Sequence, residues 1–539
     1  MNTKSFRSSP IIDPKGGLKA TALYNLLLLV LLITILTVRI LLLVEIPAGL
    51  FLDEASIGYN AVTIGATGVD EHGVQLPVYF ESVGDYKNPV FIYAAAVMFR
   101  IFGVSEFILR FTSTVFYIST LAFTILLIAR LFRGNKAVEM YALISFGFLP
   151  LFFVLSRIAF EVISQLTWIA ALNLLIWMNF HQEGNNKFDT PKAIVCGFIL
   201  GSSIYTYSTA RLLTFLTLAA IWFIYFKREN LKKLLLITAS AAISLIPFAV
   251  FTIKNPGAIT SRFQVLSYTA DSIPLTEKLG IFVQNYFTYL SPDFLILHGD
   301  PNLRHSTGHG GVIYITTLLL FAVGLISIVA GKKLGRFNLF LIVMLLFSPI
   351  PAALTSEGMP HALRSMLLGY YILLISCYGW EAIASIHNRP IQYAVISCIS
   401  LLLLFEISSY QLDYFLEYPS RSVEAMGSFD LNSSLQVAID QNPREIIFVN
   451  EPRVTYANMQ FYSLLVKNPG NIPITASDQP EPAPGTCFVY NRRNENMLNQ
   501  SPYPFYELDS LIPNMSAAFF QNTKPITSII KVRCYKNTG

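Results

Sequence analysis

The sequence predicts a polytopic α-helical membrane protein of about eleven spans, with a small α/β domain at its C-terminal end. Only 13% of the 539 residues are charged, against about 25% in soluble domains. The mean hydropathy is +0.53, and long apolar runs recur along the chain. About 20 apolar residues are enough to cross roughly 30 Å of hydrocarbon as a helix. These observations favour membrane insertion over a series of soluble domains.

The predicted spans follow one another from the N-terminal end of the chain. The first run, from Leu18 to Ile46, is too long for a signal-peptide core and has no small-residue cleavage site, so we expect it to be retained. The other apolar runs lie near residues 107–129, 138–156, 161–180, 192–210, 212–226, 234–253, 312–331, 337–355, 365–386 and 391–409.

The basic residues between the spans set the predicted orientation, because Lys and Arg gather on the cytoplasmic side of short loops. If the short apolar segment 89–103 crossed the membrane, the basic N-terminus and the basic loop 130–136 would lie on opposite sides. If it stays in the interface, these two and the later basic clusters share one side. We therefore expect an interfacial helix over 89–103 and a cytoplasmic N-terminus.

Three segments then face outward: a first loop over about 47–106, a second over about 254–311, and the tail from about 410. We expect a membrane module over 1–409 and an extracytoplasmic domain over 410–539, with strand-like pieces at 445–450 and 486–491. Cys487 and Cys534 lie in this tail and could pair in an oxidising compartment, although pairing cannot be read from sequence alone.

Several function classes find no support in the sequence. It contains no Walker-type glycine loop and no dinucleotide fingerprint, so a soluble nucleotide-driven mechanism is not indicated. No basic stripe with interleaved aromatic residues suggests a nucleic-acid partner. We expect the chain to lie in the cytoplasmic membrane, where membrane lipid surrounds it.

The first outer loop concentrates ionisable residues beside the membrane. It contains Asp53-Glu54, Asp70-Glu71, Asp85 and Lys87. Ionisable groups next to hydrocarbon are costly and often functional. Each also has a structural interpretation: Asp53 as a helix N-cap, the second acidic pair as a turn, and Lys87 as a side chain reaching back to the interface.

The later outer segments hold weaker candidates. Arg211 begins a span at its outer end, where it could be an interfacial anchor, and Glu161 beside Arg157 has a structural interpretation. His361 and Arg364 lie in a short outer loop, where an arginine runs against the positive-inside bias. The second loop gathers His298, Asp300, Arg304, His305 and His309. These could ligate a metal, contact a substrate, or simply build an irregular loop.

Three motifs of the first loop resemble a known superfamily. They are D-E-A-x-x-x-Y-N-A, T-G-x-D-E-x-G-x-x-x-P and G-D-Y-K-x-P, followed by FGVSEFILRF, HGDPNLRHSTGHGG and MPHALRS. The pattern resembles the GT-C glycosyltransferases, and more narrowly the bacterial relatives of protein O-mannosyltransferases and of lipid A aminoarabinose transferases. The resemblance extends to about residue 420.

The resemblance implies transfer of a sugar from a polyprenyl phosphate, at the outer membrane face and with inversion, to a protein, lipid or glycan acceptor. It implies that Asp53 acts as base, that Glu54 supports it, and that Lys87 contacts the lipid phosphate. The remaining candidates for substrate or lipid-phosphate binding are Asp70, Glu71, Asp85, Arg211, Arg304, His305, His361 and Arg364. No nucleotide cofactor is expected at the site, and a divalent metal stays open.

Two other functions remain as alternatives. A transporter or flippase of a lipid-linked sugar would place ionisable residues near the bilayer midplane, often in repeats, whereas here they gather in outer loops. A non-catalytic envelope protein would tolerate substitution of Asp53 and Lys87.

Overall fold

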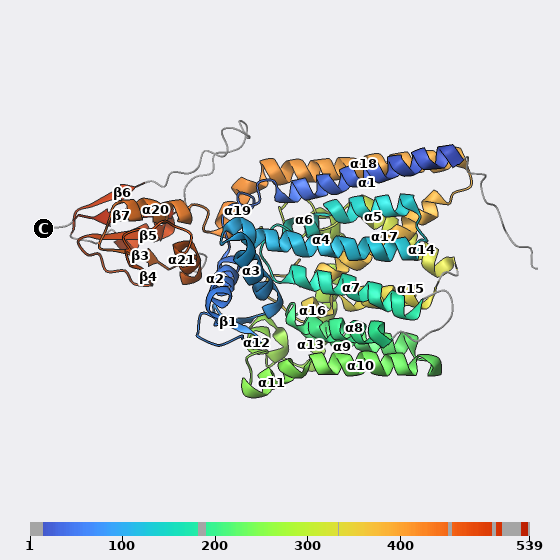
Figure 1. The fold of residues 1–539 in the computed structure, drawn as a ribbon, viewed down its shortest axis with the longest axis horizontal. Helices are drawn as coiled ribbons and strands as arrows, with labels where there is room; N and C mark the ends of the chain where they lie inside the picture. The colour runs from blue at the N-terminus through green and yellow to red at the C-terminus, as the bar shows by residue number, and fades with distance from the viewer. Residues whose placement is uncertain are drawn as a thin grey trace, which may run out of the picture.

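The computed structural model describes residues 14–181, 190–331, 334–450, 455–498, 503–508 and 530–536. Within these ranges the molecule is a bundle of helices joined at one end to a small sheet domain (Figure 1). Seven of the described segments are long and apolar enough to cross a membrane. They are α1 (Pro14–Ile40), which meets the criterion from Ala22, α4 (Glu106–Leu131), α7 (Val162–Phe180), α10 (Leu231–Ser244) continued by α11 (Ile246–Lys254), α15 (Arg336–Phe347) continued by α16 (Ile350–Ala353), α17 (Met366–Ala384) and α18 (Arg389–Leu416).

The other predicted spans are shorter helices. They are α5 (Lys136–Phe148) with α6 (Pro150–Leu155), α8 (Thr190–Ser202) with η1 (Ser203–Tyr205), α9 (Ala210–Tyr225) and α14 (Ile315–Ala330). Several apolar runs are divided into two consecutive helices. Three of these divisions fall at Pro150, Pro247 and Pro351, because proline lacks the backbone N–H that continues a helix. Each apolar run therefore forms helix where expected, and the count of eleven spans remains a prediction.

The packing of the bundle centres on α17, most of whose residues are buried. Its closest neighbour is α14, and two glycines allow the contact. A Cβ on Gly379 would lie 1.9 Å from the Leu320 carbonyl oxygen, and one on Gly324 would lie 2.2 Å from that of Ile375. Small residues of this kind let membrane helices approach closely where no hydrophobic effect drives them together.

The outer segments gather at the end of the bundle that faces the sheet domain (Figure 1). The first loop forms α2 (Leu52–Thr67), the hairpin of β1 (Phe80–Ser82) and β2 (Asp85–Lys87), and α3 (Pro89–Phe102). At about 1.5 Å per residue α3 is about 21 Å long, too short for the hydrocarbon layer. The second loop forms α12 (Ser261–Leu266), η3 (Tyr268–Ala270), α13 (Leu275–Tyr289) and the π-helix η4 (Asp293–Leu297). Around the second loop's histidines the chain is irregular, as expected.

The C-terminal domain is a five-stranded mixed sheet with order β4-β3-β5-β7-β6. Strands β3 (Glu445–Val449), β4 (Ile474–Ser477) and β5 (Thr486–Asn491) are parallel, whereas β7 (Ile530–Tyr535) runs antiparallel to β5 and to β6 (Phe505–Leu508). Its helices are α19 (Tyr418–Met426), α20 (Leu431–Asp440), α21 (Tyr456–Ser463), η5 (Arg492–Asn494) and α22 (Glu495–Leu498). On the cytoplasmic side predicted for the bundle, η2 (Arg228–Asn230) precedes α10.

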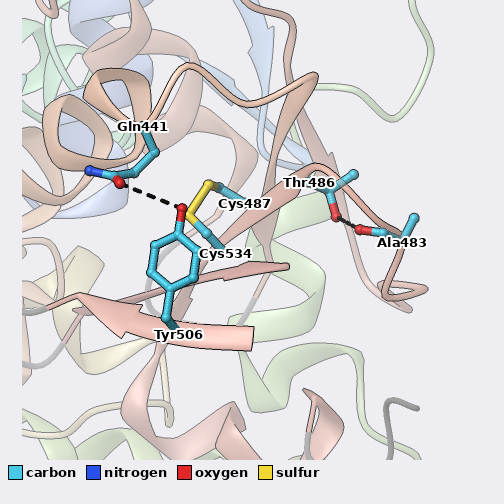
Figure 2. The surroundings of a disulfide bond; sticks show 6 residues. All are labelled: Gln441, Ala483, Thr486, Cys487, Tyr506 and Cys534. Atoms are coloured by element: carbon cyan, nitrogen blue, oxygen red, sulfur yellow. Dashed lines mark hydrogen bonds between the residues drawn. A yellow bond between two sulfur atoms is a disulfide. The ribbon is translucent and has the colours of Figure 1, made fainter. Parts of the chain in front are cut away.

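A disulfide joins Cys487 to Cys534, which face each other on β5 and β7 (Figure 2). Tyr506 on β6 lies beside this bond, with its hydroxyl 3.5 Å from the side-chain oxygen of Gln441. The two tail cysteines that the sequence left unassigned therefore connect the two antiparallel strands at the centre of the sheet.

Candidate active site

A cavity of about 770 Å³ lies among the outer segments of the membrane module. Its walls come from α2, the β1–β2 hairpin, α9, α12 and the loops that precede α14 and α17. Eight of the residues predicted from sequence line it: Asp53, Asp85, Lys87, Arg211, Arg304, His305, His361 and Arg364. The cavity thus unites residues that are up to 311 positions apart, from Asp53 to Arg364.

Asp53 and Lys87 form an ion pair in this cavity. Asp53 lies in the first turn of α2, where the helix dipole favours a carboxylate, and Lys87 ends β2. The helix is capped at Phe51, so the interpretation of Asp53 as the N-cap is wrong. The Asp53 side chain is 35% exposed and that of Lys87 11%, so the carboxylate remains accessible from the cavity.

The ion pair fixes the charge of both partners. Burial alone would raise the pKa of the Asp53 carboxyl, but Lys87, assisted by Arg304, holds this pKa below its usual range. Burial would lower the pKa of Lys87, but Asp53 and then Glu161 raise it to about 12. Both groups are therefore ionised near neutral pH, and the pair presents a carboxylate and an ammonium side by side.

Glu161 holds the end of the β1–β2 hairpin next to this pair. It is buried and accepts hydrogen bonds from the backbone N–H and the side-chain amide of Asn88, which follows Lys87. Burial raises the pKa of the Glu161 carboxyl to about 7, although Lys87 and Asn88 oppose the shift. Its sequence position beside Arg157 suggested a local pair, but the structure joins it to the first loop instead.

Glu54 lies on the other side of the α2 turn and does not line the cavity. It is fully buried, with Oε1 3.0 Å and Oε2 3.2 Å from two nitrogens of Arg110. Its oxygens also accept from the backbone N–H groups of Phe51 and Ala159. All of these partners belong to the protein, so Glu54 holds the turn that carries Asp53 in place.

The second acidic pair builds the loop and is also outside the cavity lining. Asp70 Oδ1 accepts from the backbone N–H groups of His72 at 2.9 Å and Val74 at 2.8 Å, which is the turn interpretation. Glu71 Oε1 accepts from the side-chain amide of Asn60 at 3.0 Å, and Asn60 accepts from the Glu71 backbone. These contacts attach the loop to α2.

Four arginines also line the cavity. Arg211 donates to the Ile259 carbonyl at 2.7 Å and lies over the Tyr79 ring. Arg364 donates to Thr355 Oγ1 at 2.9 Å and to the Glu357 carbonyl at 2.8 Å.

The other two arginines are Arg304 and Arg262. Arg304 stacks on Phe51, with its guanidinium carbon 4.0 Å from the ring centroid. Arg262 on α12 reaches 4.0 Å from Asp85 Oδ2 and is half exposed. Arg262 is not among the residues predicted from the sequence, although an arginine in an outward loop also departs from the positive-inside bias.

The histidines of the second loop divide into separate environments. His298 is exposed and pairs with Asp293, and His309 contacts Ser409 at 3.0 Å. His305 is buried, with Nδ1 2.9 Å from Asp300 Oδ2, and its ring stacks on His361 from the following outer loop. Thus the three histidines close in sequence do not gather, whereas His305 meets one that is 56 positions away.

Comparisons with known proteins agree with this architecture. A family model described as dolichyl-phosphate-mannose-protein mannosyltransferase matches residues 86–253, which include Lys87, Glu161 and Arg211. The structure of ArnT from Cupriavidus metallidurans bound to undecaprenyl phosphate superposes with a TM-score of 0.56 at 12% identity, covering 94% of this chain and 97% of that one. The chain therefore shares the overall fold of ArnT.

Two further solved structures also match the chain. The apo state of the same ArnT gives the same TM-score and identity, with 95% of this chain and 98% of that chain covered. The oligosaccharyltransferase AglB from Archaeoglobus fulgidus, in complex with an inhibitory peptide and a dolichol phosphate, gives 0.48 at 12% identity, over 84% of this chain and 61% of that one. No curated protein sequence matches the chain significantly. The predicted GT-C fold, with a membrane bundle and a small C-terminal sheet domain, is confirmed.

Proposed function

We propose that this chain transfers a monosaccharide from a polyprenyl-phosphate-linked donor to an acceptor hydroxyl or amine, with inversion at the anomeric carbon. The observation that carries the proposal is the cavity itself. It places the accessible carboxylate of Asp53 beside Lys87, in a cavity that four arginines also line. Sugar transfer from a lipid phosphate needs both: a base for the acceptor proton and cations for the leaving phosphate.

The charges of the site suggest how the step proceeds. The donor phosphate binds Lys87 and these arginines, which draws the ammonium away from Asp53. Because Lys87 holds the pKa of Asp53 down, its departure makes the carboxylate a stronger base. The acceptor oxygen or nitrogen then attacks the anomeric carbon and loses its proton to Asp53. The bond from the anomeric carbon to the phosphate oxygen breaks, and polyprenyl phosphate leaves with the electron pair.

The comparisons support the class of donor. The ArnT structure that shares this fold contains undecaprenyl phosphate, and the matching family model describes an enzyme that uses dolichyl-phosphate mannose. In both cases the named lipid is a polyprenyl phosphate. The acceptor of this chain is a protein, a lipid or an envelope glycan.

The proposed location is the outer face of the cytoplasmic membrane. The disulfide Cys487–Cys534 forms readily only in an oxidising compartment. The sheet domain that carries it lies at the same end of the bundle as the first outer loop (Figure 1). Basic residues cluster at the other ends of the helices, for example around η2, which agrees with the positive-inside rule.

The deciding experiment compares Asp53→Asn with wild type in membranes supplied with radiolabelled polyprenyl-phosphate sugars. Asparagine keeps the size of the side chain but loses the base, so we expect transfer to fall about 100- to 10,000-fold. Asp70→Asn is the matched control, because it is the same change in the same loop outside the cavity. Equal transfer by Asp53→Asn and wild type would contradict the proposal. Movement of the labelled lipid between leaflets without transfer would favour a flippase instead.

A further inference from the structure

We propose that Asp300, His305 and His361 form a binding site for one zinc-like divalent cation in the wall of the cavity. The first two residues lie in the loop between η4 and α14, and the third lies in the loop that precedes α17. Each offers a ligand atom, and the three atoms lie within 4.8 Å of one another. The site thus joins two outer loops that the sequence separates.

Two of the ligand positions are already adjacent. Asp300 Oδ2 and His305 Nδ1 lie 2.9 Å apart, whereas two ligands of one tetrahedral zinc ion at bond lengths of about 2.0–2.1 Å would lie roughly 3.3 Å apart. An ion can therefore enter by displacing the proton that these atoms share, with a shift of a few tenths of an ångström. The backbone N–H groups of Asn302 and Ala362 donate to the Asp300 carboxylate and keep it in this position.

The third ligand, His361, has a ring nitrogen without a hydrogen-bond partner. His361 Nδ1 is buried and has no hydrogen-bond partner in the structure, although buried polar atoms are almost always paired. The His361 ring stacks on His305 with centroids 4.5 Å apart, which places it beside the Asp300–His305 pair. A bound cation would satisfy this nitrogen.

The ligand atoms and the charges around them select the kind of ion. Arg304 and Arg364 lie near both histidines. Two nitrogens and one carboxylate suit zinc better than magnesium or calcium, which prefer all-oxygen sites. The two arginines oppose a bare dication, so an anion in the remaining coordination position would strengthen binding.

The remaining position faces the cavity, since His305 and His361 both line it. If the proposed function holds, the anion there is the donor phosphate, and the ion would add one more positive charge to the group that stabilises the leaving lipid phosphate. This link rests on the proposed function, whereas the metal site itself does not.

The test is zinc binding by purified full-length protein after chelator treatment, followed by isothermal titration calorimetry and by the zinc-dependent rise in melting temperature. We expect one zinc per chain, and an affinity about 100-fold lower or worse in His305→Asn and in His361→Asn. His298→Asn and His309→Asn are the matched controls, because both histidines lie near the same loop but outside the cluster. These two variants should bind like wild type.

Two outcomes overturn the site: no zinc binding by wild type, or equal losses in the cluster variants and the controls. A second titration in the presence of undecaprenyl phosphate tests the link to the donor. We expect the lipid phosphate to tighten zinc binding in wild type. An unchanged affinity would overturn that link while leaving the metal site in place. Both results are read without any transfer assay, so they remain separate from a failure of the proposed function.

Discussion

The two sides of the first turn of α2 hold adjacent carboxylates in contrasting ways. On the cavity side, Asp53 is partly exposed and shares one ion pair with Lys87. On the buried side, Glu54 is fully enclosed, and four hydrogen bonds from Arg110 and two backbone N–H groups satisfy it. Both carboxylates have a cationic partner, but only the first pair lines the cavity, where a ligand could reach it.

Buried arginines on this side also hold the segment between α1 and α2. Arg110 also donates to four backbone carbonyls in that turn, those of Leu43, Val44, Pro47 and Gly49. Arg157 donates to the carbonyls of Val38, Leu41, Leu42 and Ile46. Two fully buried arginines therefore hold an irregular segment by donating to its backbone carbonyls, which need hydrogen-bond partners when buried. A buried charge whose every polar atom is satisfied internally is structural, whereas one with an exchangeable partner is available for chemistry.

The largest expected effect on stability is at Glu54. Glu54→Gln keeps most of the hydrogen-bonding shape but leaves the Arg110 charge buried without its counter-ion, which costs about 3–5 kcal/mol. We expect a large drop in the melting temperature of the detergent-purified protein. Asp53→Asn should change the melting temperature little, because Asp53 is partly exposed and Glu161 remains as an acidic neighbour of Lys87. Equal melting temperatures for the two variants would remove the distinction between the two sides.

The next effect concerns pH and the cavity-side residue Glu161. In the folded protein the pKa of the Glu161 carboxyl is about 7, above the ordinary value of about 4.3. Between these two pH values the folded state keeps a proton that the unfolded state has lost. This contribution to stability is complete below the ordinary value and is lost as pH rises through 7. Over this interval wild type should lose roughly 1–3 kcal/mol relative to Glu161→Gln. Parallel stability profiles from pH 4 to 8 for the two proteins would contradict the prediction.

A smaller effect is expected where the C-terminal domain contacts the segment between α1 and α2. Ser428 Oγ accepts from the Leu50 N–H at 3.0 Å and donates to the Leu50 carbonyl at 2.6 Å, three residues before Asp53. Ser428→Ala removes both bonds from a buried site, which costs about 1–3 kcal/mol. If the domain positions Asp53, the variant should also lose about tenfold in kcat with little change in KM. Ser433→Ala, which loses only a local bond to Asp430, is the control.

The contrast also explains what could be predicted from the sequence. Apolar runs located the helices, because their length and composition are local properties. The first-loop motifs singled out Asp53 and Lys87 through the resemblance, and the two side chains form an ion pair, while their roles stay a prediction. Glu54 could not be separated from Asp53, because its role depends on Arg110 on another helix. His361 could not be joined to His305, because only the packing of two distant loops brings them together.

The smallest expected effect is at Asp70, which the sequence placed among the substrate ligands and the structure places in a turn. Asp70→Asn keeps an oxygen for the N–H groups of His72 and Val74, so we expect stability within about 0.5 kcal/mol and transfer within about twofold of wild type. Asp70→Ala loses both bonds and should cost about 1–2 kcal/mol, with transfer per folded molecule preserved. Melting temperature and sugar transfer, measured on the same preparations, separate these results. If Asp70→Asn lost transfer as Asp53→Asn does while remaining folded, the substrate would have to reach beyond the cavity to this turn, and position relative to the cavity would no longer separate chemical from structural carboxylates.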